Sequence, residues 1–194
     1  YKIKVGTADD IAIVKALREN TTATLRVDAN AAWDVNTALQ LIPQLAALGV
    51  ELVEQPLAKD DWEGMKILYK ESVLPLYADE SCVFEQDVER CANHFHGINI
   101  KLTKCSGITP ARRMIKKAKE LNMKVMVGCM NESTIGSAAI AHLLPFIDEV
   151  DMDGPLLLEE DVATGILYDH GKILYSDEAG LGVQFTGLFQ KALV

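Results

Sequence analysis

Acidic side chains recur at the ends of short apolar segments along this chain. Asp28, Glu54 and Asp79 each end such a segment, within the sequences VDAN, VEQP and ADES. Carboxylates that gather at one point repel one another unless a cation lies among them. A hard divalent cation with oxygen ligands, most simply Mg²⁺, fits three such carboxylates. The alternative is that each acid is an ordinary charge at the rim of a sheet.

Lysines follow the same pattern. Lys4 and Lys101 also end apolar segments, and Lys2 lies two residues before Lys4, on the same face of a strand. Lysines are rarely buried without a functional reason, because desolvation of an ammonium group is costly. A nearby dication and a second lysine both lower a lysine pKa toward that of a useful base. Two bases flanking a metal-bound carboxylate can move a proton between the two faces of the adjacent carbon, which is racemisation or epimerisation.

The spacing of the apolar segments predicts the scaffold that positions these residues. Seven segments recur at intervals of 22 to 28 residues and end at Lys4, Asp28, Glu54, Asp79, Lys101, Cys129 and Asp151. One strand, one helix and two loops fill such an interval, which is typical of βα units in a parallel sheet. The predicted fold is therefore α/β, a TIM-type (β/α) barrel, in which all strand carboxyl ends meet at one face.

Amphipathic helical patterns lie between the segments, in residues 11–17, 38–48, 62–68, 88–91, 108–118 and 135–143. The regular spacing ends after residue 155, so we expect the barrel in residues 1–155 and a C-terminal extension in residues 156–194. A hairpin around His170 and Gly171 is predicted in this extension. Tyr1 directly precedes a strand, and we interpret the segments as strands 2–8 of a (β/α)7β barrel. The first strand and a capping domain, on which the extension would pack, are expected before Tyr1.

Composition narrows the classes of partner. The chain has 194 residues, and its formal net charge of −9 disfavours binding to nucleic acid or to an anionic membrane surface. No apolar run is long enough to span a membrane, and we expect a cytoplasmic protein. The four cysteines show no CxxC spacing and are predicted to be reduced. His94 and His96 are interpreted as solvated loop residues and not as metal ligands. A homo-oligomer is compatible with the sequence, although no decisive surface motif is present.

The set Lys2-Ile3-Lys4, Asp28, Glu54, Asp79 and Lys101 resembles the enolase superfamily, and within it the muconate-lactonizing subgroup. Asp151-Met152-Asp153 resembles the DxD motif on the last strand of the dipeptide epimerases, the group that includes L-Ala-D/L-Glu epimerase. The resemblance covers residues 1–185. It implies one Mg²⁺ per active site, bound by Asp28, Glu54 and Asp79. It also implies that Lys4 and Lys101 are the acid–base catalysts, with Lys2 tuning Lys4.

The resemblance further implies an isomerase, a dipeptide epimerase that moves the α-proton of the C-terminal residue through a metal-stabilised enediolate. Asp151 and Asp153 would hold the α-ammonium group of the dipeptide, since adjacent carboxylates need a cation; loop solvation or helix capping is the alternative for both. Cys129 and Glu132 are candidates to border the substrate, although Glu132 also fits an ordinary helix start. Asn30, Glu80 and Ser81 are expected to orient the metal ligands from behind.

Other functions remain open at this stage. N-acylamino acid racemisation, o-succinylbenzoate synthesis and muconate cycloisomerisation belong to the same superfamily. Their substrates have no free ammonium in the corresponding place, so the DxD motif argues against them. A hypothesis of a different class is that the chain is a catalytically inactive barrel fragment.

Overall fold

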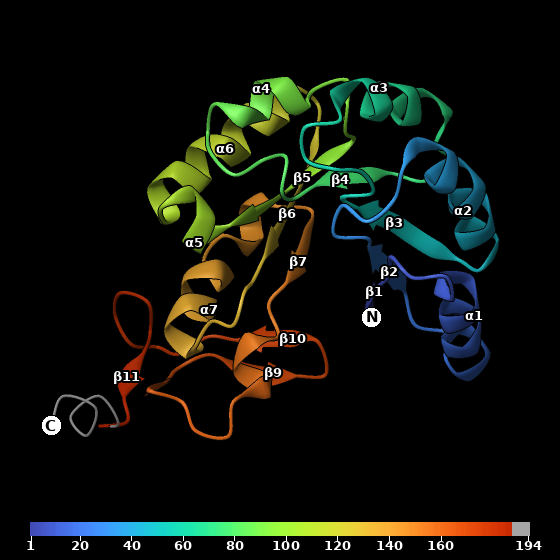
Figure 1. Ribbon diagram of the computed structural model, residues 1–194. Helices are drawn as coiled ribbons and strands as arrows, with labels where there is room; N and C mark the ends of the chain where they lie inside the picture. The colour runs from blue at the N-terminus through green and yellow to red at the C-terminus, as the bar shows by residue number, and fades with distance from the viewer. Residues whose placement is uncertain (188–194) are drawn as a thin grey trace, which may run out of the picture. The chain divides into compact units, whose positions relative to one another are not determined.

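The computed structural model describes residues 1–187, and strands and helices alternate along most of this length (Figure 1). The strands of the main sheet are β1 (Lys2–Lys4), β2 (Leu25–Asp28), β3 (Val50–Glu54), β4 (Leu76–Ala78), β5 (Gly97–Lys101), β6 (Lys124–Gly128) and β7 (Glu149–Asp151). They follow one another in the sheet in chain order. The pairs β1–β2, β2–β3, β3–β4, β4–β5 and β6–β7 are parallel. The seven predicted strands and the predicted parallel sheet are confirmed.

Helices connect the strands, as the sequence pattern predicts. They are α1 (Asp10–Asn20), α2 (Val35–Ala47), α3 (Trp62–Glu71), α4 (Asp87–Cys91), α6 (Ile108–Glu120) and α7 (Thr134–Ala141). Asp34 caps α2 by accepting a hydrogen bond from Thr37 N–H at 2.7 Å, and Gly49 follows the helix with φ +75°. The short helix α5 (Leu102–Cys105) was not predicted. It spans a single turn, which is too short to show a helical period in the sequence.

The described chain forms two compact units, and each is considered by itself. The first unit contains Tyr1–Asn99 and Lys116–Lys124, and the second contains Ile100–Ile115 and the chain from Val125 onward. In the first unit, β4 is buried at every residue, and α2 packs against both α1 and α3. A strand covered on both faces needs no alternation of apolar and polar residues, which explains the continuous apolar runs. The predicted boundary at residue 155 remains a prediction.

The second unit includes the segment that follows β7. The 3-10 helix η2 (Gly154–Leu157) comes first, and strands β9 (Leu167–Asp169) and β10 (Lys172–Leu174) then form the predicted antiparallel hairpin. Strands β8 (Ala163–Thr164) and β11 (Gln184–Phe185) also pair with each other, and η1 (Leu144–Phe146) follows α7. Residues 188–194 of the predicted extension lie outside the described residues. No helix among residues 1–187 is long and apolar enough to cross a membrane.

The segment after β7 is attached to both ends of α7. Asp161 Oδ2 accepts a hydrogen bond from Thr134 N–H at 2.7 Å, at the first residue of the helix. At the other end, the Tyr175 hydroxyl donates to Ala141 O at 2.7 Å. Ser133 precedes the helix without a side-chain capping bond, so the cap is supplied by a residue distant in the sequence.

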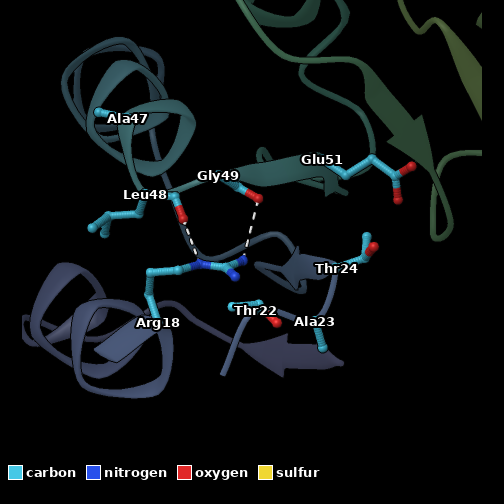
Figure 2. A pocket seen from close by; sticks show the side chains of 8 residues that line it. All are labelled: Arg18, Thr22, Ala23, Thr24, Ala47, Leu48, Gly49 and Glu51. Atoms are coloured by element: carbon cyan, nitrogen blue, oxygen red, sulfur yellow. Dashed lines mark hydrogen bonds between the residues drawn. The ribbon is translucent and has the colours of Figure 1, made fainter. Parts of the chain in front are cut away.

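Arg18 joins the amino ends of β2 and β3 beside a cavity of about 610 Å³ (Figure 2). Its guanidinium group donates to Leu48 O at 2.9 Å, Thr21 O at 3.1 Å and Gly49 O at 3.4 Å. These carbonyl groups follow the last residues of α1 and α2. No backbone N–H group of the helix is left there to donate to them. The cavity lies at the strand ends opposite Asp28 and Glu54, and the arginine that lines it donates to backbone carbonyls. We therefore assign Arg18 a structural role.

Replacing Arg18 with Ala should lower the free energy of unfolding of the intact protein by about 1–2 kcal/mol, because three backbone carbonyls lose a charged donor. Chemical denaturation would measure this change. Lys15→Ala, at an exposed position on the same helix, is the matched control and should change stability by less than about 0.5 kcal/mol. Equal effects of the two substitutions would contradict the structural role.

The prediction that His96 is a solvated loop residue is wrong. Its Nδ1 accepts a hydrogen bond from Leu76 N–H at 3.1 Å, and its ring stacks on Tyr69 with centroids 4.6 Å apart. Burial lowers the pKa of the imidazole below its ordinary value of 6.5. The loop is turned back against β4 by these contacts, which a local sequence pattern does not encode.

The unfolding free energy should therefore fall as the solution is acidified. The folded pKa of His96 is depressed, so its stabilising contribution is complete above pH 6.5 and is lost as pH falls through the folded pKa. Denaturation at pH 7.5 and at lower pH values would show a smaller pH dependence in His96→Gln than in the wild type. His170→Gln, at a fully exposed side chain, is the control. An unchanged slope in His96→Gln would refute the assignment.

Candidate active site

Parallel register brings three of the predicted residues into one row across neighbouring strands. Lys4 on β1 pairs with Asp28 on β2, and Asp28 pairs in turn with Glu54 on β3. Both carboxylate residues are fully buried. Each residue is the last of its strand, so the row lies at the carboxyl ends of β1, β2 and β3. The spacing of the apolar segments predicts that these strand ends lie side by side. The structure shows this arrangement within the first unit.

Two lysine ammonium groups lie against the two buried carboxylates. Lys2 Nζ is 3.1 Å from Asp28 Oδ2 and 2.9 Å from Glu54 Oε2. Lys4 Nζ donates at 2.7 Å to Asp28 Oδ2 and also at 2.7 Å to Asn30 Oδ1. Lys2 and Lys4 therefore share one face of β1, as predicted, and their charges balance those of the carboxylates.

Burial and charge act differently on the two acids. Burial disfavours ionisation of Asp28, but the Lys2 charge and hydrogen bonds from Lys4 and Asn30 N–H outweigh it, so the Asp28 pKa is lowered. Burial is also the largest effect on Glu54, where the Lys2 charge opposes it and the Asp28 charge adds to it. The net result is a raised Glu54 pKa. A positive charge beside Glu54 would therefore have a strong effect on its ionisation.

The two carboxylate oxygens of Glu54 have different partners. Its Oε1 accepts a hydrogen bond from Asn99 Nδ2 at 2.7 Å. Its Oε2 is buried and is ion-paired with Lys2 Nζ at 2.9 Å. Asn99 is itself buried and was missed from the sequence. Its position in the segment INIK could have identified it. Asn99 lies two residues before Lys101, and residues two apart on a strand share a face.

Asp79 follows β4 and is 1% exposed. Its N–H group donates to Gln55 Oε1 at 3.0 Å, and Ser81 N–H donates to the same oxygen at 3.1 Å. Glu80 Oε1 accepts from Asn30 Nδ2 at 3.2 Å, which links the loops after β2 and β4. Asn30 thus lies in the loop that follows Asp28, and Glu80 and Ser81 lie in the loop that follows Asp79. Their predicted role behind the metal ligands stays a prediction.

Asp10 is a second buried residue that the sequence reasoning missed. At 1% exposure, it accepts hydrogen bonds from Gly6 N–H, Thr7 N–H and Trp33 Nε1, the last at 3.0 Å. These bonds connect the loop after Lys4 with the loop after Asp28. Gly6 has φ +118°, and a Cβ there would lie 2.6 Å from Ala32 Cβ, so this close approach requires glycine. The aspartate stands at a helix start, where it resembles an ordinary cap in sequence.

Lys4 and Lys101 were both expected to be buried, and this is correct for Lys101 only. Lys101, the last residue of β5, is 7% exposed in the second unit. The Lys4 side chain is 64% exposed, although it had been expected inside the fold. In the described sheet β1 has one neighbour, β2, so the Lys4 side chain is covered from that side by Asp28 and Asn30.

The second unit gathers Cys129, Asp151 and Asp153. One ligand atom from each lies within 4.8 Å of the others. Cys129 N–H donates to Asp151 O at 2.7 Å, and its thiol donates to Asp153 Oδ1 at 3.5 Å. Burial, together with the charges of both aspartates, raises the pKa of the Cys129 thiol to about 11. The thiol is therefore neutral at physiological pH and serves as a hydrogen-bond donor.

The prediction that Asp151 and Asp153 share one strand is wrong. Strand β7 ends at Asp151, and Asp153 precedes the 3-10 helix η2, which has Pro155 in its first turn. Proline has no N–H group to continue a strand, and its fixed φ suits a helical turn. The two carboxylates nevertheless meet beside Cys129. Glu132 is 8% exposed; its Oε2 accepts from Met130 N–H, and its Oε1 is buried without a partner.

The donor chemistry of the first unit suits a hard divalent cation. Asp28, Glu54 and Asp79 are buried acids, and carboxylate oxygens are the ligands that such a cation prefers. Among residues 1–187 the three acids do not form a group within 4.8 Å, whereas Cys129, Asp151 and Asp153 do. The ammonium groups beside Asp28 and Glu54 take the position of counterions here.

Several known proteins are similar to the chain. It is 56% identical over 183 residues to an L-Ala-D/L-amino acid epimerase of Flavobacterium johnsoniae. This match covers 94% of this chain and 54% of that protein. A dipeptide epimerase from Cytophaga hutchinsonii, solved with Mg and the dipeptide D-Ala-L-Val, matches with a TM-score of 0.92 at 32% identity. That match covers 98% of this chain and 55% of the other. The substrate-liganded L-Ala-D/L-Glu epimerase from Bacillus subtilis matches with a TM-score of 0.89 at 36% identity, over 94% of this chain and 54% of that one.

The chain spans about half the length of the curated relatives it matches. The resemblance to the enolase superfamily, first seen in its lysines and acids, is confirmed by these relatives and by the shared fold. The matching family model, described as enolase C-terminal domain-like, covers residues 1–187. The chain therefore belongs to the enolase C-terminal domain-like family.

Proposed function

We propose that this chain carries the catalytic residues of a Mg²⁺-dependent dipeptide epimerase. The observation that carries the proposal is the row of Lys4, Asp28 and Glu54 at neighbouring strand ends, where both acids are fully buried. The similarity to L-Ala-D/L-amino acid and dipeptide epimerases supports it. We further propose that β1–β7 correspond to strands 2–8 of a (β/α)7β barrel. The segment after residue 155 would then pack on a capping domain.

Asp28, Glu54 and Asp79 would hold the Mg²⁺ ion. When bound, the cation neutralises the substrate carboxylate and stabilises the negative charge that develops as the α-proton leaves. Asn99 would keep the Glu54 carboxylate in place through its 2.7 Å hydrogen bond to Oε1. Asn30, Glu80 and Ser81 would fix the loops that carry Asp28 and Asp79.

Lys4 and Lys101 would be the two acid–base groups, one for each face of the α-carbon. Lys4 is suited to proton transfer because its side chain is 64% exposed while its ammonium is oriented by Asp28 and Asn30. Lys2, which contacts both carboxylates, would keep a second positive charge near Lys4. Lys101 is buried, so its amine would act away from bulk water.

Asp151 and Asp153 would bind the α-ammonium group of the dipeptide. The neutral Cys129 thiol donates to Asp153 and leaves the carboxylate charge in place. Two carboxylates beside a neutral thiol attract a cation, and a free ammonium fits that requirement. Glu132 would border the same part of the substrate. This preference for a free ammonium separates dipeptides from N-acylated amino acids, the substrates of the alternative reaction.

The two-base assignment predicts distinct effects of each lysine. In deuterated water with Mg²⁺ and a panel of dipeptides, the intact protein should epimerise the second residue and incorporate deuterium at its α-carbon. Lys4→Ala and Lys101→Ala should each reduce epimerisation about 10²- to 10⁴-fold, because each removes one general acid–base group. Each variant should retain exchange from one epimer only, and the retained epimer should differ between them. Proton NMR would follow both processes.

Lys66→Ala, an exposed lysine on α3, is the matched control and should behave as the wild type. A single base would be indicated if one lysine variant lost exchange from both epimers while the other variant lost exchange from neither. No exchange on any dipeptide in the wild type would exclude the dipeptide epimerase assignment.

The ammonium site predicts a selective loss in Asp151→Asn. For a dipeptide with a free amino group, kcat/KM should fall about 10- to 100-fold, because a charged hydrogen bond is lost. For the N-acetylated analogue the change should be small, since it carries no ammonium. Steady-state kinetics with both substrates measures the difference, and Asp177→Asn, at an exposed position, is the control. Unchanged dipeptide turnover would instead favour the N-acylamino acid racemase, o-succinylbenzoate synthase or muconate cycloisomerase branch.

A further inference from the structure

Gln55 connects the three loops that carry the proposed metal ligands. Its own backbone follows Glu54 directly, and its carbonyl oxygen accepts from Ala31 N–H at 2.8 Å, in the loop after Asp28. Its side-chain Oε1 accepts from Asp79 N–H at 3.0 Å and Ser81 N–H at 3.1 Å. One residue therefore makes hydrogen bonds to the loops after β2 and β4 while it stands at the end of β3.

The side-chain amide of Gln55 is fully used and its orientation is unambiguous. Its Nε2 donates to Leu57 O at 2.9 Å and to Ser81 Oγ at 2.9 Å. Backbone N–H groups can only donate and the Leu57 carbonyl can only accept, so the amide oxygen and nitrogen cannot be exchanged. The residue is completely buried, so no water competes with these bonds.

The backbone of Gln55 adopts an unfavourable conformation. Its φ is +36°, which is unusual for a residue with a long side chain, and it directly precedes Pro56, which also restricts it. Such strain persists only where surrounding contacts hold it in place, and it occurs frequently at functional sites. Here the strain places the amide where Asp79 and Ser81 can both reach it.

We infer that Gln55 is a positioning residue that sets the metal affinity by fixing Asp79 relative to Glu54. The inference rests on the proposed function, in which both acids bind Mg²⁺. Outer contacts that orient metal ligands commonly contribute a factor of 10 to 100 in affinity. Gln55 touches no substrate in this role, and it acts on the ion only through the acids that it holds.

Gln55→Asn separates this role from the backbone strain. Asparagine tolerates positive φ better than glutamine and keeps the amide group, but its side chain is one methylene shorter. The variant should fold, lose the bonds to Asp79 and Ser81, and bind Mn²⁺ about 10- to 100-fold more weakly than the wild type. Electron paramagnetic resonance of free Mn²⁺, titrated into the intact metal-free protein well below its unfolding temperature, would measure this.

Gln44→Asn, at an exposed position on α2, is the matched control and should leave Mn²⁺ affinity unchanged. A folded Gln55→Asn variant with wild-type Mn²⁺ affinity would overturn the inference, because a purely structural role lowers stability without altering the dissociation constant. Failure of the wild type itself to bind Mn²⁺ or Mg²⁺ would instead refute the proposed function, so the two failures are distinguishable.

A measurement on the wild type covers the case in which Gln55→Asn does not fold. If the Gln55 contacts favour metal binding, metal binding must stabilise those contacts by the same factor. Saturating Mg²⁺ should then slow hydrogen exchange of the Asp79 and Ser81 amides about 10- to 100-fold relative to Leu121 N–H, which donates within the end of α6. Unchanged relative exchange of these two amides would overturn the inference.

Discussion

The arrangement of charge at the first three strand ends depends on the parallel register of β1, β2 and β3. That register sets Lys4 against Asp28 and Asp28 against Glu54, and both acids are withdrawn from water. Two adjacent buried carboxylates repel each other and lose hydration, so they require positive charge. Lys2 and Lys4 supply it from one edge. A shift of one residue along any of these strands would turn the acids to the opposite face and remove the site.

Hydrogen bonds between loops hold this cluster in one geometry. Asn99 fixes one oxygen of Glu54, Gln55 joins the loops after β2, β3 and β4, and Asp10 joins the loops after β1 and β2. All three are buried polar residues, and each is costly to bury unless its partners are present. Their bonds therefore favour a single arrangement of the loops.

The second unit has a different electrostatic character. Asp151 and Asp153 approach the Cys129 thiol, which stays neutral because burial and the two negative charges oppose its ionisation. The cluster therefore keeps negative charge that an external cation can complement. Its position is set by β7, by the turn into η2 and by α7, whose two ends are attached through Asp161 and Tyr175 to the segment after residue 157. This segment thus supports the loop that carries Cys129 and Glu132.

The sequence by itself determined the seven strands, the main helices and the acids and lysines at the strand ends. These features follow from short-range information: apolar period, turn and cap residues, and charges placed where an apolar run stops. The tertiary structure alone decided the contacts of Gln55, Asn99 and Asp10, the exposure of Lys4 and the contacts of His96. Each of these depends on partners 20 to 45 residues away or on the close packing of one loop against another. Such partners are fixed only when strand register and loop packing are set together, which no local pattern in the sequence specifies.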